Sequence, residues 1–290
     1  MIENRTPAQK SLTVVNYTII TLVALVCLYP MLHVLAASFS DPIRLIRHRG
    51  VLLWPDGISL KGYETVMHNP NILTGYANTL FYVVVGTALN MLLTTLGAYV
   101  LSRTGWPFRK FFVFLFVFTM YFSVGMIPTF MLVKNVGLLN SRWAILLPTA
   151  VNTWNLIVMR TSFAAIPNEM QESAYIDGAS DLRIMVQIYI PLAKATMAVM
   201  ILFYVVEHWN AWFTSMIYLT DTSKYPLQMF VRDILLYDGA GGTTEDANAI
   251  YMKELTKYAV IIVAVVPILC VYPFVQKFFV KGVMLGSVKG

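Results

Sequence analysis

Six long apolar runs divide the chain, and each is long enough to cross a lipid bilayer as one helix. A spanning helix needs roughly 18 to 20 apolar residues, and backbone N–H and C=O groups cannot stay unpaired in lipid. Apolar residues make up 58% of the chain and charged residues only 12%, which excludes an ordinary soluble domain. We therefore predict an all-α polytopic membrane protein with six transmembrane helices. The runs are residues 12–37, 76–101, 111–133, 143–163, 192–219 and 258–279.

An even number of spans puts both termini on one side of the membrane. Lys and Arg are divided almost evenly between the two sets of loops, so they favour cytoplasmic termini only weakly. The first run is too long for the core of a cleavable signal peptide, and we expect it to remain as a span. The two cysteines, Cys27 and Cys270, lie inside apolar runs and indicate neither a disulfide framework nor a metal site.

Residues 166–191 form the longest polar interruption on the side of the termini, and their pattern predicts two short helices with a corner between them. Gly178 supplies the left-handed φ that ends the first helix, and Ser180 or Asp181 can cap the second. The second helix is predicted to end at Pro191 and to bury one apolar face. The residues of that face are Leu182, Met185, Val186 and Tyr189.

This loop also carries a spaced motif, made of Glu172, Ser173, Ala174, Asp177, Gly178 and Pro191. The motif resembles the EAA loop of ATP-binding-cassette (ABC) importer permeases, in which E-A-A precedes a glycine and then I-x-L-P. Ser173 stands where the pattern has its first alanine. The resemblance implies a type I importer permease, whose cytoplasmic EAA coupling loop meets an ATPase subunit through these six residues.

The resemblance extends over the rest of the chain, which we expect to be a single transmembrane permease domain, residues 1–290. Its core is expected at about 76–280, its first span at 12–37 and its cytoplasmic tail at 281–290. In maltose-type permeases a similar tail reaches into the ATPase dimer. The resemblance implies the same contact here for Gly286, Ser287 and Lys289.

The fifth run holds a carboxylate and an imidazole at membrane depth, Glu207 and His208. Each ionisable group there costs roughly 2.5–3.5 kcal/mol on insertion scales, so both should face protein or water. An interhelical hydrogen-bonding role and direct substrate contact both remain open. Aromatic faces and amides suit sugars, and the candidate residues for a substrate path are Tyr204, Glu207, Trp209 and Asn210.

Trp209-Asn210, together with Tyr225-Pro226-Leu227-Gln228 and Arg232, resembles the branch of carbohydrate permeases associated with polysaccharide or lipoprotein transport. The resemblance implies an oligosaccharide or polysaccharide as the substrate. The net charge of +6 would suit an anionic glycan of the uronate type, such as alginate or pectin fragments, although basic residues at membrane edges also attract anionic lipid.

The sequence contains no Gly-x-x-x-x-Gly-Lys-Ser/Thr phosphate loop, no Gly-x-Ser-x-Gly and no His-Glu-x-x-His, so neither nucleotide binding nor catalysis is predicted. No cofactor is expected on this chain, and ATP and Mg²⁺ are expected to be used by partner ATPase subunits. The implied partners are a second homologous permease, two ABC ATPases, an external or periplasmic solute-binding protein and membrane lipid, without nucleic acid.

One alternative is a self-sufficient secondary transporter for a polar solute, driven by ions through Glu207. Such a transporter has no use for a docking loop like 166–191, and its expected inverted repeats are not evident in the sequence. The docking loop therefore favours an importer permease. In maltose-type systems the partner permease makes most sugar contacts, so this chain alone leaves the glycan open.

Overall fold

The structure, a computed structural model, describes residues 7–122, 124–236 and 247–287. Within these residues it is all-helical, apart from one isolated bridge between Ser40 and Ile58. Two compact units are distinguished. Unit 1 comprises Met1–Pro70 and Ile234–Val265, and unit 2 comprises Asn71–Asp233 and Val266–Gly290.

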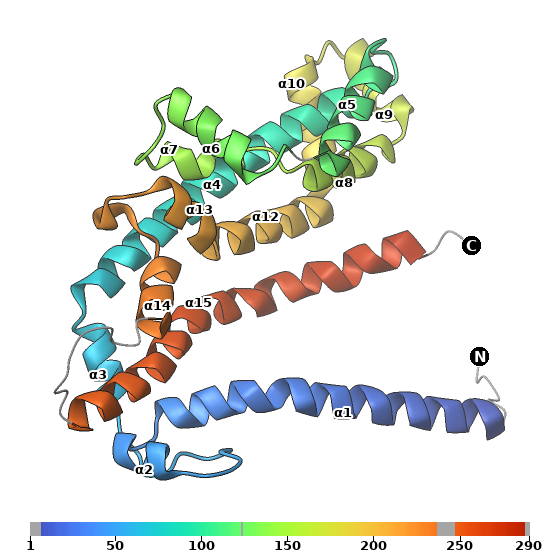
Figure 1. Ribbon diagram of the computed structural model, residues 1–290. Helices are drawn as coiled ribbons and strands as arrows, with labels where there is room; N and C mark the ends of the chain where they lie inside the picture. The colour runs from blue at the N-terminus through green and yellow to red at the C-terminus, as the bar shows by residue number, and fades with distance from the viewer. Residues whose placement is uncertain (1–6, 123, 237–246, 288–290) are drawn as a thin grey trace. The chain divides into compact units, whose positions relative to one another are not determined.

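Three helices of unit 1 come first in the chain: α1 (Pro7–Ser38), α2 (Pro42–Arg47) and α3 (Lys61–Met67). The long helix α15 (Ala247–Ser287) begins in this unit and ends in unit 2. Asp41 begins α2 as its N-cap, because its carboxylate accepts hydrogen bonds from the backbone N–H groups of Ile43 and Arg44. Figure 1 labels these helices along the ribbon.

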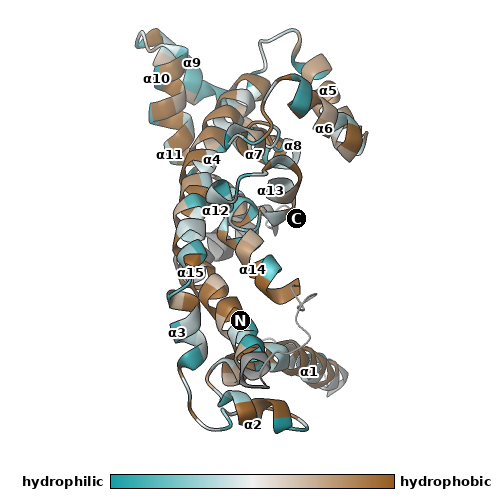
Figure 2. Ribbon diagram, turned by 60° about the vertical axis from the view of Figure 1, so that its left-hand side comes forward, coloured by the Kyte–Doolittle hydropathy of each residue, from teal (hydrophilic) through white to brown (hydrophobic). Residues whose placement is uncertain are grey.

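Unit 2 is built around α4 (Pro70–Ser102), the helix of the second apolar run. The other elements up to residue 236 are α5 (Arg109–Tyr121), α6 (Met126–Asn135), α7 (Trp143–Leu146), α8 (Thr153–Ala164), α9 (Asn168–Ile176), α10 (Asp181–Ile184), the π-helical turn η1 (Met185–Tyr189), α11 (Ile190–Leu192), α12 (Lys194–Trp209), α13 (Trp212–Tyr218), the 3₁₀ turn η2 (Thr222–Lys224) and α14 (Leu227–Leu236). Figure 2 shows hydrophobic colour along most of the long helices and hydrophilic colour on α9.

The prediction of an all-helical, multi-span membrane protein is confirmed. In the described residues, three single helices are long and apolar enough to cross a membrane: Gln9–Ser38, Pro70–Ser102 and Met252–Val271. The number rises to five if two bent helix pairs each count as one span, α5 with α6 and Asp181–Leu192 with α12. The prediction of six spans is therefore met only in part.

Three of the six predicted runs are divided rather than continuous, each for a local reason. Run 111–133 breaks before Gly125, whose φ is +84°. Run 143–163 is split into α7 and α8, because Pro148 cannot donate a helical hydrogen bond and Asn152 starts a new helix by accepting from the N–H of Asn155. Run 192–219 breaks at Asn210, between α12 and α13.

The main buried cluster of unit 2 joins the end of α4 to α8 and to the 166–191 loop. Leu156, Met159 and Phe163 of α8 lie in it with Tyr99 of α4 and Tyr189 of η1. Tyr189 touches both Tyr99 and Phe163 edge-on, with ring centroids 5.1 and 5.5 Å apart. The polar loop is thus packed firmly onto the second span.

Candidate functional site

The corner of the 166–191 loop is formed at Gly178, as the sequence predicts. Gly178 has a φ of +75°. Its N–H donates to the carbonyl of Tyr175 (3.0 Å), and the N–H of Ala179 donates to that of Ala174 (2.9 Å). This pair of bonds is the Schellman arrangement, in which a residue with positive φ satisfies the last carbonyls of a helix. The backbone conformation alone therefore favours glycine at residue 178, although a Cβ there would contact no other atom within 4 Å.

The predicted coupling residues on α9 divide between a packed side and an exposed side. Ala174 is buried in the cluster with α4 and α8. Glu172, Ser173 and Asp177 are exposed. No side-chain hydrogen bond or ion pair involves Glu172 within the described part of the chain. The α9 helix therefore presents an unpaired carboxylate to solvent or to a partner.

The predicted apolar face of the second helix is half right. Met185 and Tyr189 are buried together with Ile184, but Leu182 and Val186 are 63% and 50% exposed. The buried stripe runs through Ile184, so Leu182, which lies in α10 before the π-helical turn η1, and Val186, which lies within that turn, fall to one side of it.

The prediction that this helix ends at Pro191 holds to within one residue. The last helical residue is Leu192, and the chain bends by 87° before α12 begins at Lys194. In the turn before Pro191, the N–H of Ile190 donates to the carbonyl of Met185, five residues back. A proline can follow such a turn without costing an α-helical hydrogen bond.

Arg103, directly after α4, holds the 166–191 loop through one polar cluster. Its guanidinium donates to Asp181 Oδ1 (3.3 Å), to the hydroxyl of Tyr175 and to that of Tyr189 (3.3 Å). It also lies over the ring of Tyr99, 4.9 Å from the centroid. Arginine suits this place, because its planar group can donate several hydrogen bonds while stacking on aromatic rings.

Asp181 is the common acceptor of this cluster. Besides Arg103, its Oδ1 accepts hydrogen bonds from Tyr175 (2.6 Å) and Tyr99 (3.1 Å). The hydrogen bond from Tyr175, aided by those from Tyr99 and the charge of Arg103, holds the pKa of Asp181 below its ordinary value. The same bond raises the pKa of the Tyr175 hydroxyl. Asp181 is therefore an ionised anchor and not a helix cap.

The candidate residues of the fifth run do not converge on one cavity. Tyr204 is fully buried, and its hydroxyl shares a 2.7 Å hydrogen bond with Thr94 of α4. Trp209 is 5% exposed and meets the ring of Tyr76 edge-on. Asn210 is exposed and donates to the carbonyl of Val206, one turn earlier (2.9 Å). Two of the four residues thus serve packing against α4.

Glu207 is the candidate that faces a cavity. It is exposed and lines a pocket of about 670 Å³ together with Asn152, Trp154 and Asn155 at the start of α8. The rest of the lining is apolar: Leu202, Phe203, Val206 and Ile268. Glu207 is the candidate residue that lines this pocket of unit 2.

His208, the neighbour of Glu207, has an interhelical role. It is 2% exposed, and its Nε2 lies 2.7 Å from Oδ1 of Asn90, whose Nδ2 donates to the carbonyl of Thr149 (2.6 Å). The close approach of α12 depends on Gly86, since a Cβ there would lie 2.4 Å from Nε2 of His208. Of the two readings of His208, the structure supports interhelical hydrogen bonding.

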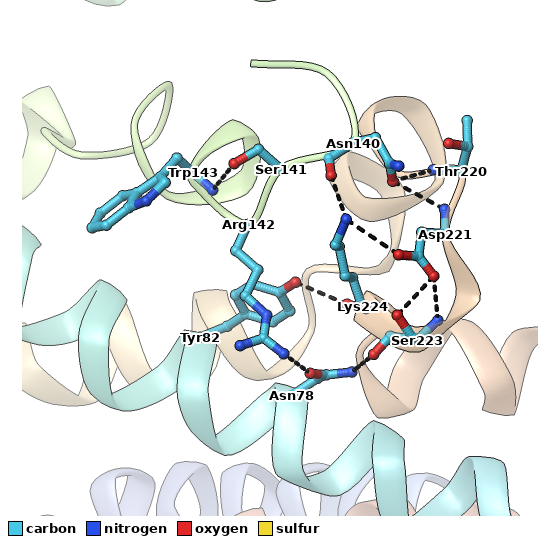
Figure 3. Close-up of polar contacts among 10 residues, drawn as sticks. All are labelled: Asn78, Tyr82, Asn140, Ser141, Arg142, Trp143, Thr220, Asp221, Ser223 and Lys224. Carbon is cyan, nitrogen blue, oxygen red and sulfur yellow. Dashed lines mark hydrogen bonds and ion pairs between the residues drawn. The ribbon is translucent and has the colours of Figure 1, made fainter. Parts of the chain in front are cut away.

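A second polar network, not anticipated from the sequence, fastens the other end of α4 to two loops (Figure 3). Asn78 accepts from Arg142 Nη2 (2.8 Å) and donates to the carbonyls of Ser223 (2.7 Å) and Tyr225 (3.0 Å). Tyr82 donates from its hydroxyl to the carbonyl of Lys224 (2.8 Å). Asn78 therefore ties together three segments that are distant in the sequence.

Asn140 completes this network from the loop after α6. With a φ of 57°, it is the one described residue other than glycine that has a positive φ. Its Oδ1 accepts from the N–H groups of Thr220 (3.2 Å) and Asp221 (3.0 Å), and its carbonyl accepts from Lys224 Nζ (2.9 Å). Lys224 also pairs with Asp221 at 3.2 Å, as Figure 3 shows.

The predicted contact of the C-terminal tail falls at the end of the described residues. Lys289 lies outside the described residues, and for Gly286 and Ser287 only the helical backbone is described.

Three residues of the polar networks, Arg103, Asp181 and Asn78, were not identified as network residues from the sequence. Asp181 is expected only as a helix cap, and no interhelical partner is predicted for Arg103 or Asn78. Arg103 and Asp181 are 78 positions apart and Asn78 and Arg142 are 64 apart, and local spacing does not encode such pairings.

The sequence of this chain is similar to those of a known protein family and of several characterised proteins. Residues 94–285 match the family described as binding-protein-dependent transport system inner membrane component. The chain is 43% identical over 277 residues to the polygalacturonan/rhamnogalacturonan transport system permease protein YtcP of Bacillus subtilis (strain 168), covering 94% of this chain and 96% of that protein. It is 38% identical over 289 residues to protein LplC of the same organism, covering 99% and 98%.

A solved structure is similar as well. One chain in the crystal structure of a bacterial ABC transporter involved in the import of the acidic polysaccharide alginate superposes with a TM-score of 0.87 and 34% sequence identity. The match covers 95% of this chain and 99% of that one. The coupling loop, α8 and α12 all fall inside the residues that match the family.

Proposed function

The chain belongs to the inner-membrane components of binding-protein-dependent transport systems, and from this membership we propose that it is the permease subunit through which an ABC importer moves an acidic polysaccharide into the cell. The observation that carries the importer role is the 166–191 loop. It presents the unpaired carboxylate of Glu172 on one side and is fixed to α4 through Arg103 and Asp181 on the other.

The proposed substrate is a polyuronate of the polygalacturonan or alginate type. The relative YtcP is named for polygalacturonan and rhamnogalacturonan transport, and the similar solved transporter is described as an alginate importer. Both descriptions concern acidic polysaccharides, and the net charge of +6 suits such a substrate. The pocket beside Glu207 offers a route for sugar units, with its indole at Trp154 and amides at Asn152 and Asn155.

The proposed assembly contains a second homologous permease, two ABC ATPase subunits and a solute-binding protein outside the membrane. We place both termini and the 166–191 loop in the cytoplasm, where the ATPases are, and residues 38–75 outside. Support for a neighbouring subunit or lipid comes from α1, since only 6% of its most apolar window is buried within the chain.

In the proposed mechanism, α9 docks in a cleft of an ATPase subunit. Closure of the ATPase dimer on ATP moves α9, and the Arg103–Asp181 pair passes that movement to α4, while Tyr189 passes it to α8 through the shared buried cluster. The spans then alternate between inward-open and outward-open arrangements. The ATPase must bind one arrangement better than the other for its closure to shift the equilibrium.

The proposal is tested by reconstituting the full complex in proteoliposomes with ATP inside. Uptake of labelled oligogalacturonate should require ATP, the ATPases and the binding protein, and should exceed uptake of a neutral maltooligosaccharide of equal length. Equal uptake of both sugars would overturn the proposed substrate. Uptake by this chain alone, without ATPase subunits, would overturn the importer role in favour of a secondary transporter.

A further inference from the structure

We propose that a pocket in unit 1, formed by α1, the segment after α2 and α15, binds a carboxylated sugar unit of the incoming polysaccharide at the external side of the membrane. This inference rests on the proposed function and on the proposed outside location of residues 38–75. The pocket is separate from the one beside Glu207, which lies in unit 2.

The pocket has the size and lining of a sugar subsite. Its volume is about 460 Å³, and its walls combine two imidazoles, His33 and His48, with the carboxylate of Glu254 and the phenol of Tyr258. Leu52, 2% exposed, packs against Tyr258 and gives the pocket a firm apolar floor. Sites for small ligands commonly combine such aromatic walls with a few polar groups that fix orientation.

His33 gives the pocket a polar group in need of a partner. Its Nδ1 is buried and makes no hydrogen bond with any described residue. Its ring is held between those of Tyr29 and Tyr258, each with a centroid 6.0 Å away. A buried acceptor without a partner costs less than a buried donor, so the favoured tautomer carries its proton on Nε2. The His33 ring then offers an N–H donor at the pocket wall, which suits a sugar hydroxyl or carboxylate.

The other polar groups of the pocket are partly matched already, which limits the charge they bring. Glu254 pairs with Lys257 at 3.1 Å, so its negative charge is compensated. His48 Nδ1 lies 3.4 Å from Asp56 Oδ2, a long contact. The pocket itself is therefore close to neutral, and its selectivity for an anion has to come from its surroundings.

Those surroundings carry an excess of positive charge, because three arginines outnumber the two nearby carboxylates, Asp41 and Asp56. Arg44, Arg47 and Arg49 lie within six residues around His48, all three are exposed, and none forms an ion pair with a described residue. Arg47 and Arg49 flank the pocket residue His48 directly. Guanidinium groups pair well with carboxylates, and an uncompensated cluster raises the local concentration of a polyanion. A polyuronate carries a carboxylate on each sugar, so one unit can enter the pocket while its neighbours meet the arginines.

The test measures binding of trigalacturonate to the complete transporter in lipid nanodiscs, without the solute-binding protein, by titration calorimetry. The double variant Arg47→Gln/Arg49→Gln and the single variant His33→Asn probe the rim and the pocket. Lys134→Gln is the matched control, because Lys134 is an exposed cation of unit 2 and does not line the pocket. Losing one hydrogen bond should weaken binding about fivefold in His33→Asn, and the double variant should also lose much of the salt dependence.

Several outcomes overturn the inference. Unchanged affinity in both test variants, or an equal loss in Lys134→Gln, would show that the pocket does not bind the sugar. Reduced binding to phosphatidylglycerol vesicles with unchanged trigalacturonate affinity would identify the arginines as a lipid contact. If both variants also keep wild-type uptake in proteoliposomes with the binding protein, this inference fails while the proposed function stands. No uptake of oligogalacturonate by the wild type would instead remove the proposed function.

Discussion

Arg103 Nη2 lies 3.3 Å from Asp181 Oδ1, so the residue that follows α4 and the first residue of α10 share one ion pair. Two tyrosines donate to the same carboxylate oxygen, and the guanidinium stacks on one of them. The 166–191 loop is therefore joined to the second span by directional contacts in addition to apolar packing. A loop held in this way can transmit a displacement with little loss.

Replacing Asp181 with Asn should uncouple transport more than it affects folding. An amide keeps the shape, and its oxygen can still accept the tyrosine hydroxyls, but it loses the charge that pairs with Arg103. Because Asp181 is 67% exposed, we expect its loss to cost less than about 1 kcal/mol of stability. ATPase activity that no longer responds to substrate, measured on an intact complex, is the expected result. Glu169→Gln, which also removes one exposed negative charge from this loop but lies outside the spaced motif, should retain full coupling.

The stability that Asp181 contributes should decrease as the pH falls. Its pKa is lowered in the folded protein, chiefly by the hydrogen bond from Tyr175, so the folded state favours the ionised form. The contribution is present above the unfolded pKa of about 3.9 and is lost as the pH falls through the lower folded value. Thermal unfolding of wild type and Asp181→Asn should therefore differ at pH 6 to 7, and the difference should shrink as the pH falls below about 3.9. A difference that grows on acidification would contradict this assignment.

Charge reversal at Glu172 tests the docking role of α9. Glu172 is exposed and unpaired among the described residues, so Glu172→Lys should leave the fold intact. If Glu172 meets a basic residue of the ATPase, like charges would then face each other, and we expect loss of uptake. The measurement is uptake together with copurification of all subunits. Glu169→Lys, in the first turn of α9, controls for the added positive charge, and full uptake by Glu172→Lys would rule out the contact.

Gly86→Ala should destabilise the contact between α4 and α12. The new Cβ would lie 2.4 Å from Nε2 of His208, so the imidazole must leave its hydrogen bond with Asn90 or the helices must separate. Such overpacking typically costs about 1–3 kcal/mol. Thermal unfolding in detergent measures the effect. Gly105→Ala is the matched control, since nothing lies within 4 Å of its Cβ and its φ is not positive, and adding His208→Ala should restore part of the loss.

Gly178 allows backbone strain to be separated from crowding. No heavy atom lies within 4 Å of a Cβ at Gly178, so Gly178→Ala meets only the cost of a positive φ, about 1 kcal/mol or slightly more. Gly178→Asn should cost less, because Asn tolerates this conformation better. Equal unfolding temperatures for Gly178→Ala and wild type would show that the corner relaxes to another conformation.

The sequence predicted those parts of the fold that are set by composition and by local backbone conformation. The apolar runs that became α1, α4 and α15 were recognised because a span is defined by length and hydropathy, and the corner at Gly178 because a positive φ favours glycine. The predicted buried face of the second helix was half right, because Ile184 joins Met185 and Tyr189 in the core while Leu182 and Val186 are exposed. Apolar residues lie on both sides of that stripe, so the local sequence does not decide which of them face the core.

The candidate site was predicted less well than the fold, for a related reason. Glu172 and Gly178 belong to a local motif and could be named from it. The Arg103–Asp181 pair joins residues 78 positions apart, and a single sequence holds no record of such a pairing. In the fifth run, composition marked Tyr204, Glu207, Trp209 and Asn210 equally, and only the packing on α4 separated buried Tyr204 and Trp209 from exposed Glu207.

The hydrogen bonds of Asn78 form in a fixed order during synthesis of the chain, because its partners are translated at different times. Asn78 reaches Arg142, 64 residues later, and then Ser223 and Tyr225, which follow by 145 and 147 residues. Chains emerge from the ribosome N-terminus first, at about 5–20 residues per second, so α4 enters the membrane many seconds before its last partners exist. Until then the Asn78 amide needs water, the insertion machinery or another protein to satisfy it. The assembly of this permease is therefore completed late, when the loop before α14 arrives and closes the network that α4 began.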